Sequence, residues 1–246
     1  MLLGLVYGEG WAAALAHRTG LQGRVCAAEQ TLHLRHWPAD APPLRVGFAS
    51  DFHAGPTTHP ALLRAACAAL AEADVDLLLL GGDFVSLHAR HVERLTGLLA
   101  SVPAPLGRFA VLGNHDLWAD DAFITARLEE AGIQVLTNRN VRLSAPHGDL
   151  WICGLDDPTR GEPDAVAALH GAEGRRLVLM HSPDGLLALQ PHRFDLAFCG
   201  HTHAGQVALP SGRTLVVPEG DFSRRFTSGL FDLDGGGERQ LLVSPG

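Results

Sequence analysis

The sequence contains no lysine, so arginine alone provides its 19 basic side chains. Its formal net charge is -8 at pH 7, and its pI is near 5.9. Proteins dedicated to nucleic acids or anionic membranes normally carry a basic face, so this balance argues against both classes of partner. We therefore expect no dedicated nucleic-acid binding, although a local arginine cluster is compatible with the composition.

Cysteine is scarce, and the four cysteines lie far apart without any C-x-x-C pair. This spacing argues against a thiolate zinc site and against a disulfide framework. Cys67 falls in a helical pattern and Cys199 in a strand-like run, so buried free thiols are the expected state.

Long apolar runs are also lacking, because no uninterrupted stretch reaches the roughly 20 residues of a membrane-spanning helix. Residues 1–16 are apolar in patches, but Glu9 and three glycines interrupt them and no arginine precedes them. Neither a cleaved signal nor a spanning helix is expected. A short helix packed on the domain is favoured, and a helix lying on a membrane surface is the alternative. We expect a cytoplasmic protein, with peripheral contact with the inner membrane as the second option.

Strand-like and helix-like segments alternate after residue 44. Strands are predicted at Leu44–Ser50, Val75–Leu80 and Phe109–Leu112, because short apolar runs next to glycine or aspartate favour buried central strands. Helical spacing is present at Pro60–Ala73 and Asp120–Ala131. This half of the chain is therefore predicted as βαβαβα.

The second half contains many short strand candidates separated by turn residues. They lie at 134–136, 141–143, 150–154, 177–180, 196–199, 206–209, 214–217 and 230–233, with brief helices near 163–170 and 184–189. Both halves fit an α/β protein built as a four-layer αββα sandwich of two mixed β-sheets flanked by helices. The length of 246 residues favours one compact domain, with residues 1–44 as an N-terminal helix and lead-in strand before the main domain, 45–246.

Short polar segments follow the predicted strands. They are Asp51-Phe52-His53, Gly82-Asp83, Gly113-Asn114-His115-Asp116, His181 and Gly200-His201-Thr202-His203. Ligands at strand ends converge on one edge of a sheet, and carboxylate, amide and imidazole groups suit hard or borderline divalent cations. The ordered set predicts a shared site for two metal ions, although D-x-H or Gly-Asp alone is a weak signal.

Asp83 is the best candidate for a carboxylate that bridges the two ions. Two glycines precede it, and metal pairs about 3.5–4 Å apart usually share a bridging carboxylate. Asp51 and His53 are two residues apart on a strand end, so their side chains are expected on the same side. Asn114 adds a neutral oxygen, which limits the negative charge of the site.

In its order this set resembles the calcineurin-like metallophosphoesterase superfamily, over about residues 45–206. Three further segments are similar to its bacterial branch of UDP-2,3-diacylglucosamine pyrophosphohydrolases and related phosphodiesterases. They are Gly-Leu-Asp-Asp at 154–157, His-Ser-Pro-Asp at 181–184 and Gly-His-Thr-His-Ala-Gly-Gln at 200–206. The superfamily pattern is the more specific of the two.

The resemblance implies a site for two divalent ions, which manganese, iron or zinc can fill. It assigns Asp51, His53, Asp83 and His203 to one ion, and Asp83, Asn114, His181 and His201 to the other. In such enzymes a metal-bridging hydroxide attacks phosphorus in line, and the residue corresponding to His115 protonates the leaving group or stabilises charge. Asp116 is then expected to accept a hydrogen bond from His115, although it can instead cap the following turn.

Substrate contacts are less well specified. Arg224 and Arg225, expected in a loop after Gly220, can bind a phosphoryl group, although an exposed pair is equally consistent with a solvated surface. His88 and His91 follow the Asp83 loop closely enough to approach substrate.

The resemblance favours a phosphodiester or pyrophosphate substrate, such as a nucleotide-sugar or a lipid diphosphate. A phosphomonoesterase is the first alternative, and a non-catalytic scaffold of the same fold is the second. Two departures from the branch weaken the case for lipid substrates: the N-terminal anchor is weak, and the chain ends soon after the strand that finishes at Val243. The second departure predicts a sheet edge that is left uncovered or is completed by another chain in an oligomer.

Overall fold

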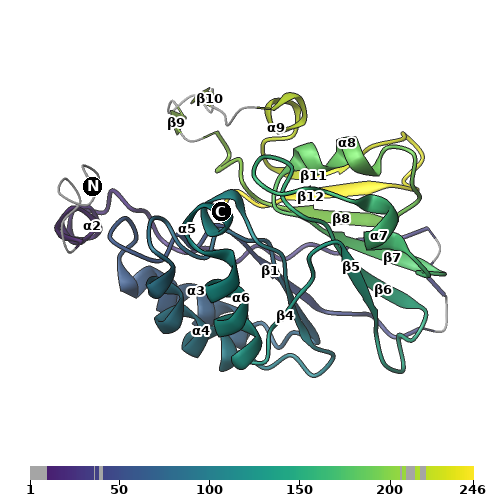
Figure 1. The fold of residues 1–246 in the computed structure, drawn as a ribbon, viewed down its shortest axis with the longest axis horizontal. Helices are drawn as coiled ribbons and strands as arrows, with labels where there is room; N and C mark the ends of the chain where they lie inside the picture. Colours follow the sequence, from purple (N-terminus) through teal and green to yellow (C-terminus); the bar gives the residue numbers. More distant parts are fainter. Residues whose placement is uncertain (1–9, 36, 39–40, 206, 209–213, 217–219) are drawn as a thin grey trace.

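Two β-sheets pack face to face between two layers of helices (Figure 1). The computed structural model describes residues 10–35, 37–38, 41–205, 207–208, 214–216 and 220–246. Three apolar cores account for the layers: one between the first sheet and its helices, one between the sheets, and one between the second sheet and its helices. This arrangement confirms the predicted α/β sandwich.

The first sheet contains β1 (Val46–Ala49), β2 (Leu77–Leu80), β3 (Arg108–Ala110) and β4 (Gln134–Val135), all parallel. The prediction of two mixed sheets is therefore correct only for the second sheet. The reason is that helices fill every connection here, and such crossovers return the chain to the same end of the sheet. These helices are α3 (Pro60–Glu72), α4 (Val92–Ala100) with the 3-10 turn η1 (Ala89–His91), α5 (Asn114–Ala119) and α6 (Asp121–Glu130).

Strand β2 shows why this sheet is so apolar. All four of its leucines are fully buried. Leu78 and Leu80 pack against the helical layer, and Leu77 and Leu79 pack between the sheets. A strand covered on both faces has no solvent side, so its sequence is a continuous apolar run.

The second sheet has the order β11-β12-β8-β7-β6-β5. Its strands are β5 (Arg139–Arg142), β6 (Leu150–Gly154), β7 (Arg175–Leu179), β8 (Leu196–Cys199), β11 (Gly229–Asp232) and β12 (Gln240–Val243). The inner four are parallel, whereas β5 and β11 are antiparallel to their neighbours. Helices α7 (Ala165–Leu169) and α8 (Leu186–Leu189), with the 3-10 turn η2 (Pro183–Gly185), lie along this sheet, and β9 (Val207–Ala208) pairs with β10 (Thr214–Val216) apart from it.

Some segments differ from the predictions. Helix α4 is not among the predicted helices, and residues 221–225 form the helix α9 (Asp221–Arg225) where a loop is predicted. Strand β12 is not an edge strand, because β11 pairs along its outer side. The predicted uncovered edge is therefore not at this strand.

The N-terminal region contains helix α2 (Trp11–Arg18), and the described residues between 19 and 45 form no strand. The predicted membrane-contacting segment lies outside the described residues over 1–9. Among the described helices, none has the length and hydropathy needed to cross a bilayer.

Candidate metal centre

The seven predicted metal ligands come together at the carboxyl ends of strands from both sheets. Asp51 and His53 follow β1, Asp83 follows β2, Asn114 opens α5 after β3, His181 follows β7, and His201 and His203 follow β8. Each carboxylate or imidazole lies within 4.8 Å of others in three overlapping groups. Residues up to 152 positions apart in the sequence, Asp51 and His203, thus share one site.

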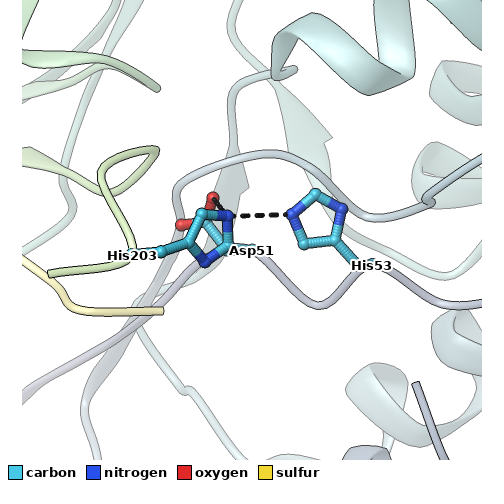
Figure 2. Close-up of side chains that lie close together, drawn as sticks. All are labelled: Asp51, His53 and His203. Carbon is cyan, nitrogen blue, oxygen red and sulfur yellow. Dashed lines mark hydrogen bonds and ion pairs between the residues drawn. The ribbon is translucent and has the colours of Figure 1, made fainter. Parts of the chain in front are cut away.

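The more exposed part of this centre is the outer group, Asp51, His53 and His203 (Figure 2). The Nε2 atoms of His53 and His203 lie 3.2 Å apart, and Nε2 of His203 lies 3.6 Å from a carboxylate oxygen of Asp51. The two histidine side chains are 17% and 28% exposed, respectively. The outer group therefore borders solvent.

The inner group comprises Asp83, His181, His201 and Asn114. Nε2 of His181 lies 3.1 Å from Oδ1 of Asn114, 3.1 Å from Nδ1 of His201 and 3.4 Å from Oδ2 of Asp83. The same Asp83 oxygen lies 3.6 Å from Nε2 of His53 in the outer group. Asp83 thus lies between the other residues of the inner group and the outer group, the position predicted for a bridging carboxylate.

Hydrogen bonding at His181 shows that the inner group fits a cation. Nδ1 of His181 lies 2.8 Å from the carbonyl oxygen of Gly81, which can only accept, so Nδ1 carries a proton. In the neutral ring, Nε2 then has no proton, and its lone pair faces the oxygens of Asn114 and Asp83. Three such acceptors lie around one point, with Nδ1 of His201 as a possible donor to His181 only, and a divalent ion satisfies all three together.

Charge in the inner group leads to the same conclusion. Burial alone would raise the pKa of Asp83, but His181, followed by His53 and His115, holds the pKa of this carboxyl well below its usual range. Burial opposes charge on His181, yet Asp83 raises the pKa of His181 well above its ordinary value. This buried carboxylate requires nearby positive charge, which either a proton or a metal ion supplies.

The backbone of the ligands is unusual. Positive φ angles occur at Asp51 (59°), His53 (44°), Asp83 (54°), His201 (69°) and His203 (49°). A left-handed conformation costs a non-glycine residue roughly 1–2 kcal/mol. Such conformations persist where the surrounding structure over-determines them, and they cluster at functional sites. The chain turns sharply at each strand end, and nothing in the sequence pattern predicts these angles.

Glycines next to the ligands leave room for the close approach of these loops. A Cβ on Gly113 would collide with the Asp83 carboxylate, and a Cβ on Gly200 would collide with the Asp51 carboxylate. These two glycines therefore allow loops that follow different strands to meet.

His115 lies beside both groups. Its backbone N–H donates to Oδ1 of Asp83 at 2.9 Å, and its ring packs edge-on against His53 with centroids 4.8 Å apart. Nδ1 lies 2.8 Å from the carbonyl oxygen of Ser86, so Nδ1 carries a proton and Nε2 remains available. His53, Asp83 and His115 also form one of the candidate ligand groups, so geometry alone fits either a ligand or a proton donor.

The predicted hydrogen bond between Asp116 and His115 is wrong. Asp116 is fully buried, and its two oxygens accept from the backbone N–H groups of Gly113 and Val85. The imidazole of His115 instead uses the Ser86 carbonyl. Burial, together with the nearby negative charge of Asp83, raises the pKa of Asp116 to about 7. Asp116 therefore ties the loop after β2 to the start of α5, and the turn-capping alternative is the better description.

The predicted substrate residues are all exposed. Arg224 and Arg225 are exposed on α9, and the guanidinium of Arg225 lies 5.1 Å from the ring centroid of Phe226. His88 is exposed, with its ring 6.2 Å from that of His91. In the described part of the chain, none of the hydrogen bonds or ion pairs joins these three residues to the predicted metal ligands.

Asp184 belongs to the His-Ser-Pro-Asp segment at 181–184, but the sequence assigns it no role of its own. Its carboxylate accepts hydrogen bonds from the backbone N–H groups of Phe222 and Ser223 and from Oγ of Ser223. These bonds hold the first turn of α9, and hence Arg224, against the segment that follows His181. Only the fold brings these two segments together, because they are about 38 residues apart.

The family of calcineurin-like phosphoesterases matches residues 44–205. This range agrees with residues 45–206, over which the sequence resembles that superfamily. Phosphodiesterase YaeI of Escherichia coli is 30% identical over 211 residues, which cover 84% of this chain and 76% of YaeI. UDP-2,3-diacylglucosamine pyrophosphatase LpxG of Chlamydia trachomatis is 27% identical over 223 residues, covering 68% of this chain and 65% of LpxG.

Among solved structures, TT1561 of Thermus thermophilus matches with a TM-score of 0.51 at 14% identity, over 74% of this chain and 91% of that protein. At this identity the likeness concerns the fold alone. It supports the layered arrangement of two sheets and helices.

Proposed function

The chain belongs to the calcineurin-like phosphoesterase family and is a phosphoester hydrolase, and we propose that it acts on phosphodiesters or pyrophosphates with two divalent metal ions. The position of Asp83 carries the proposal. One of its oxygens lies within 3.6 Å of imidazole nitrogens from both the outer and the inner group. A single carboxylate oxygen placed between two sets of N and O donors is what a pair of adjacent cations requires.

In this proposal Asp51, His53 and His203 would hold one ion, Asn114, His181 and His201 would hold the other, and Asp83 would serve both. Manganese, iron and zinc all accept such ligands. When bound, the two ions supply Lewis acidity toward the phosphoryl oxygens and a hydroxide nucleophile.

His115 has the position of a proton donor to the leaving group. The Ser86 carbonyl fixes its ring through Nδ1, so a protonated ring presents Nε2–H toward the centre. As the bond between phosphorus and the leaving oxygen breaks, Nε2 gives its proton to that oxygen. The backbone N–H of His115 donates to Asp83, so the acid and the bridging carboxylate are held in fixed register.

The preference for diesters or pyrophosphates comes from the similarity to YaeI, a phosphodiesterase, and LpxG, a UDP-2,3-diacylglucosamine pyrophosphatase. A nucleotide-sugar or lipid diphosphate belongs to the class of substrates to be tried. Arg224 and Arg225, at the exposed end of α9, are proposed contacts for a second phosphoryl group.

The test is hydrolysis of bis-p-nitrophenyl phosphate beside p-nitrophenyl phosphate, using chelator-stripped protein with manganese, iron or zinc restored in turn. Metal-dependent turnover that favours the diester supports the proposal. A preference for the monoester would replace it with a phosphomonoesterase. No turnover with any of the metals would favour a scaffold that keeps the fold without the reaction.

A further inference from the structure

A cavity of about 580 Å³ lies beside the candidate metal centre. Its walls come from the loop after β1, the first turn of α3, and the segment 87–94 that runs through η1 into α4. Ala54, Pro56, Leu63 and Leu87 contribute apolar surface to it. A volume of this size accommodates a group as large as a nucleoside or a sugar.

Two chain segments link this cavity directly to the proposed reaction site. Gly55 lines it two residues after His53, and Leu87 lines it immediately after Ser86, whose carbonyl orients His115. The two segments pack so closely that a Cβ on Gly55 would approach Oγ of Ser86 to 2.6 Å. The cavity therefore lies next to the two chain segments that carry His53 and orient His115.

The charged groups around the cavity favour an anion. Arg90 and Arg94 line it and are exposed, and neither forms an ion pair with any residue that the structure describes. Glu93 is the acidic residue of the lining. Burial, followed by the charge of Arg90 and then His88, lowers the pKa of His91, so the two guanidinium groups, rather than His91, supply positive charge here.

We propose that this cavity is the leaving-group subsite and that Arg90 and Arg94 favour leaving groups that carry a negative charge. The inference rests on the proposed function, because the leaving group lies on this side only if His115 protonates the leaving oxygen. The apolar walls hold the body of the leaving group, and the guanidinium groups meet a carboxylate or phosphate on its outer end.

Two chromogenic diesters test this directly: methyl 4-nitrophenyl phosphate and methyl 3-carboxy-4-nitrophenyl phosphate. They share the same phosphoryl centre and differ by one carboxylate on the leaving phenol. We expect kcat/KM of the wild-type protein to favour the carboxylated diester by about 5–20-fold at low ionic strength and less at high salt. The double substitution Arg90→Ala/Arg94→Ala should bring this ratio close to one, and Arg90→Lys/Arg94→Lys should restore part of it.

Arg64→Ala is the matched control, because Arg64 is an exposed arginine on α3 that does not line the cavity. It removes one positive charge from the same region and should leave the ratio unchanged. A wild-type ratio near one, or a preference that survives the double alanine variant, would overturn the subsite. If Arg64→Ala lowered the ratio as much as the double alanine variant does, the preference would come from the overall charge of the region and not from the cavity.

Failure of the proposed function gives a different result. If neither diester is hydrolysed with any metal, the proposed reaction is wrong. Binding of the free phenols then tests whether the cavity binds anions. Calorimetry should show that 5-hydroxy-2-nitrobenzoate binds the wild-type protein more tightly than 4-nitrophenol does, and that the double alanine variant loses the difference. Equal binding of the two phenols would reject the anion-binding cavity itself.

Discussion

The inner and outer groups of the metal centre share Asp83, but the fold holds their histidines differently. His181 is fully buried, and the carbonyl of Gly81 fixes its second ring nitrogen. His53 and His203 are partly exposed, and among the described residues the hydrogen bonds and ion pairs of their imidazoles stay within the centre. A ligand that is already oriented by a second hydrogen bond loses less freedom when a metal binds. The comparison teaches that one shared carboxylate can join a rigid site to a more open one.

The largest expected effect comes from removing the charge that both groups share. Asp83→Asn should lower the metal content of both groups together and abolish measurable turnover, because the amide brings no negative charge between the ions. Metal content per chain, measured by plasma emission spectroscopy, is the readout. His53→Asn should instead empty mainly the outer group.

Asp74→Asn is the control for this substitution, because Asp74 also adopts a positive φ of 51° but lies exposed in an ion pair with Arg45. It should retain full metal content. Retention of one tightly held ion in Asp83→Asn would contradict the shared carboxylate.

His115→Ala should lower the rate of the reaction without lowering the metal content. Turnover of a diester with an alkyl leaving group should fall by roughly 10²–10⁴-fold, with both metals retained. The loss should be smaller for 4-nitrophenyl esters, because a good leaving group needs less protonation.

The exposed His33 provides a control through His33→Ala, which should leave turnover unchanged. Loss of metal in His115→Ala would show that His115 is a ligand. An equal loss of turnover for good and poor leaving groups would argue against proton donation.

Graded chelation of the metal-loaded wild-type protein should resolve the two groups. We expect the outer ion to leave first, with an affinity roughly 10–100-fold weaker, because anchoring of a ligand by a second hydrogen bond has effects of this size. Stopped-flow release into a coloured chelator would then show two phases. Simultaneous release of both ions would mean that exposure and anchoring do not distinguish the groups.

The smallest effect is expected for Asp116→Asn. The asparagine offers one acceptor where the carboxylate satisfies two backbone N–H groups, which costs about 1–3 kcal/mol of unfolding free energy. For a chain of this size, the melting temperature should fall by about 2–10 °C. Calorimetry provides the measurement, and Asp121→Asn, at an exposed position in α6, is the control.

The leaving-group dependence of turnover should stay as in the wild type in Asp116→Asn, because Asp116 does not contact the imidazole of His115. If this variant reproduced the kinetic pattern of His115→Ala, Asp116 would act through the acid after all.

Much of the site could be predicted from the sequence because its polar residues come directly after apolar runs. Parallel strands place their carboxyl ends at one edge, so Asp51 and Asp83 had to lie close once β1 and β2 were adjacent. The contacts of His181 and His203 required a second sheet to pack against the first, and only the resemblance to a known family connected them beforehand.

Other features could not be predicted because they depend on which segments meet. The role of Asp116 depends on backbone N–H groups from β2's loop and from Gly113, which local sequence does not bring together. The loop predicted around Arg224 became a helix because the Asp184 carboxylate satisfies its first N–H groups.

By itself the sequence determined the α/β class, the approximate positions of the strands and the residue types of the candidate ligands, because apolar periodicity and residue type act locally along the chain. Only the tertiary structure decided the left-handed backbone at five candidate ligands, the difference in exposure between the inner and outer groups, and the cavity that Gly55 and Leu87 help to line. These features arise where loops from different strands crowd against each other, so their energies depend on distances that no local pattern contains.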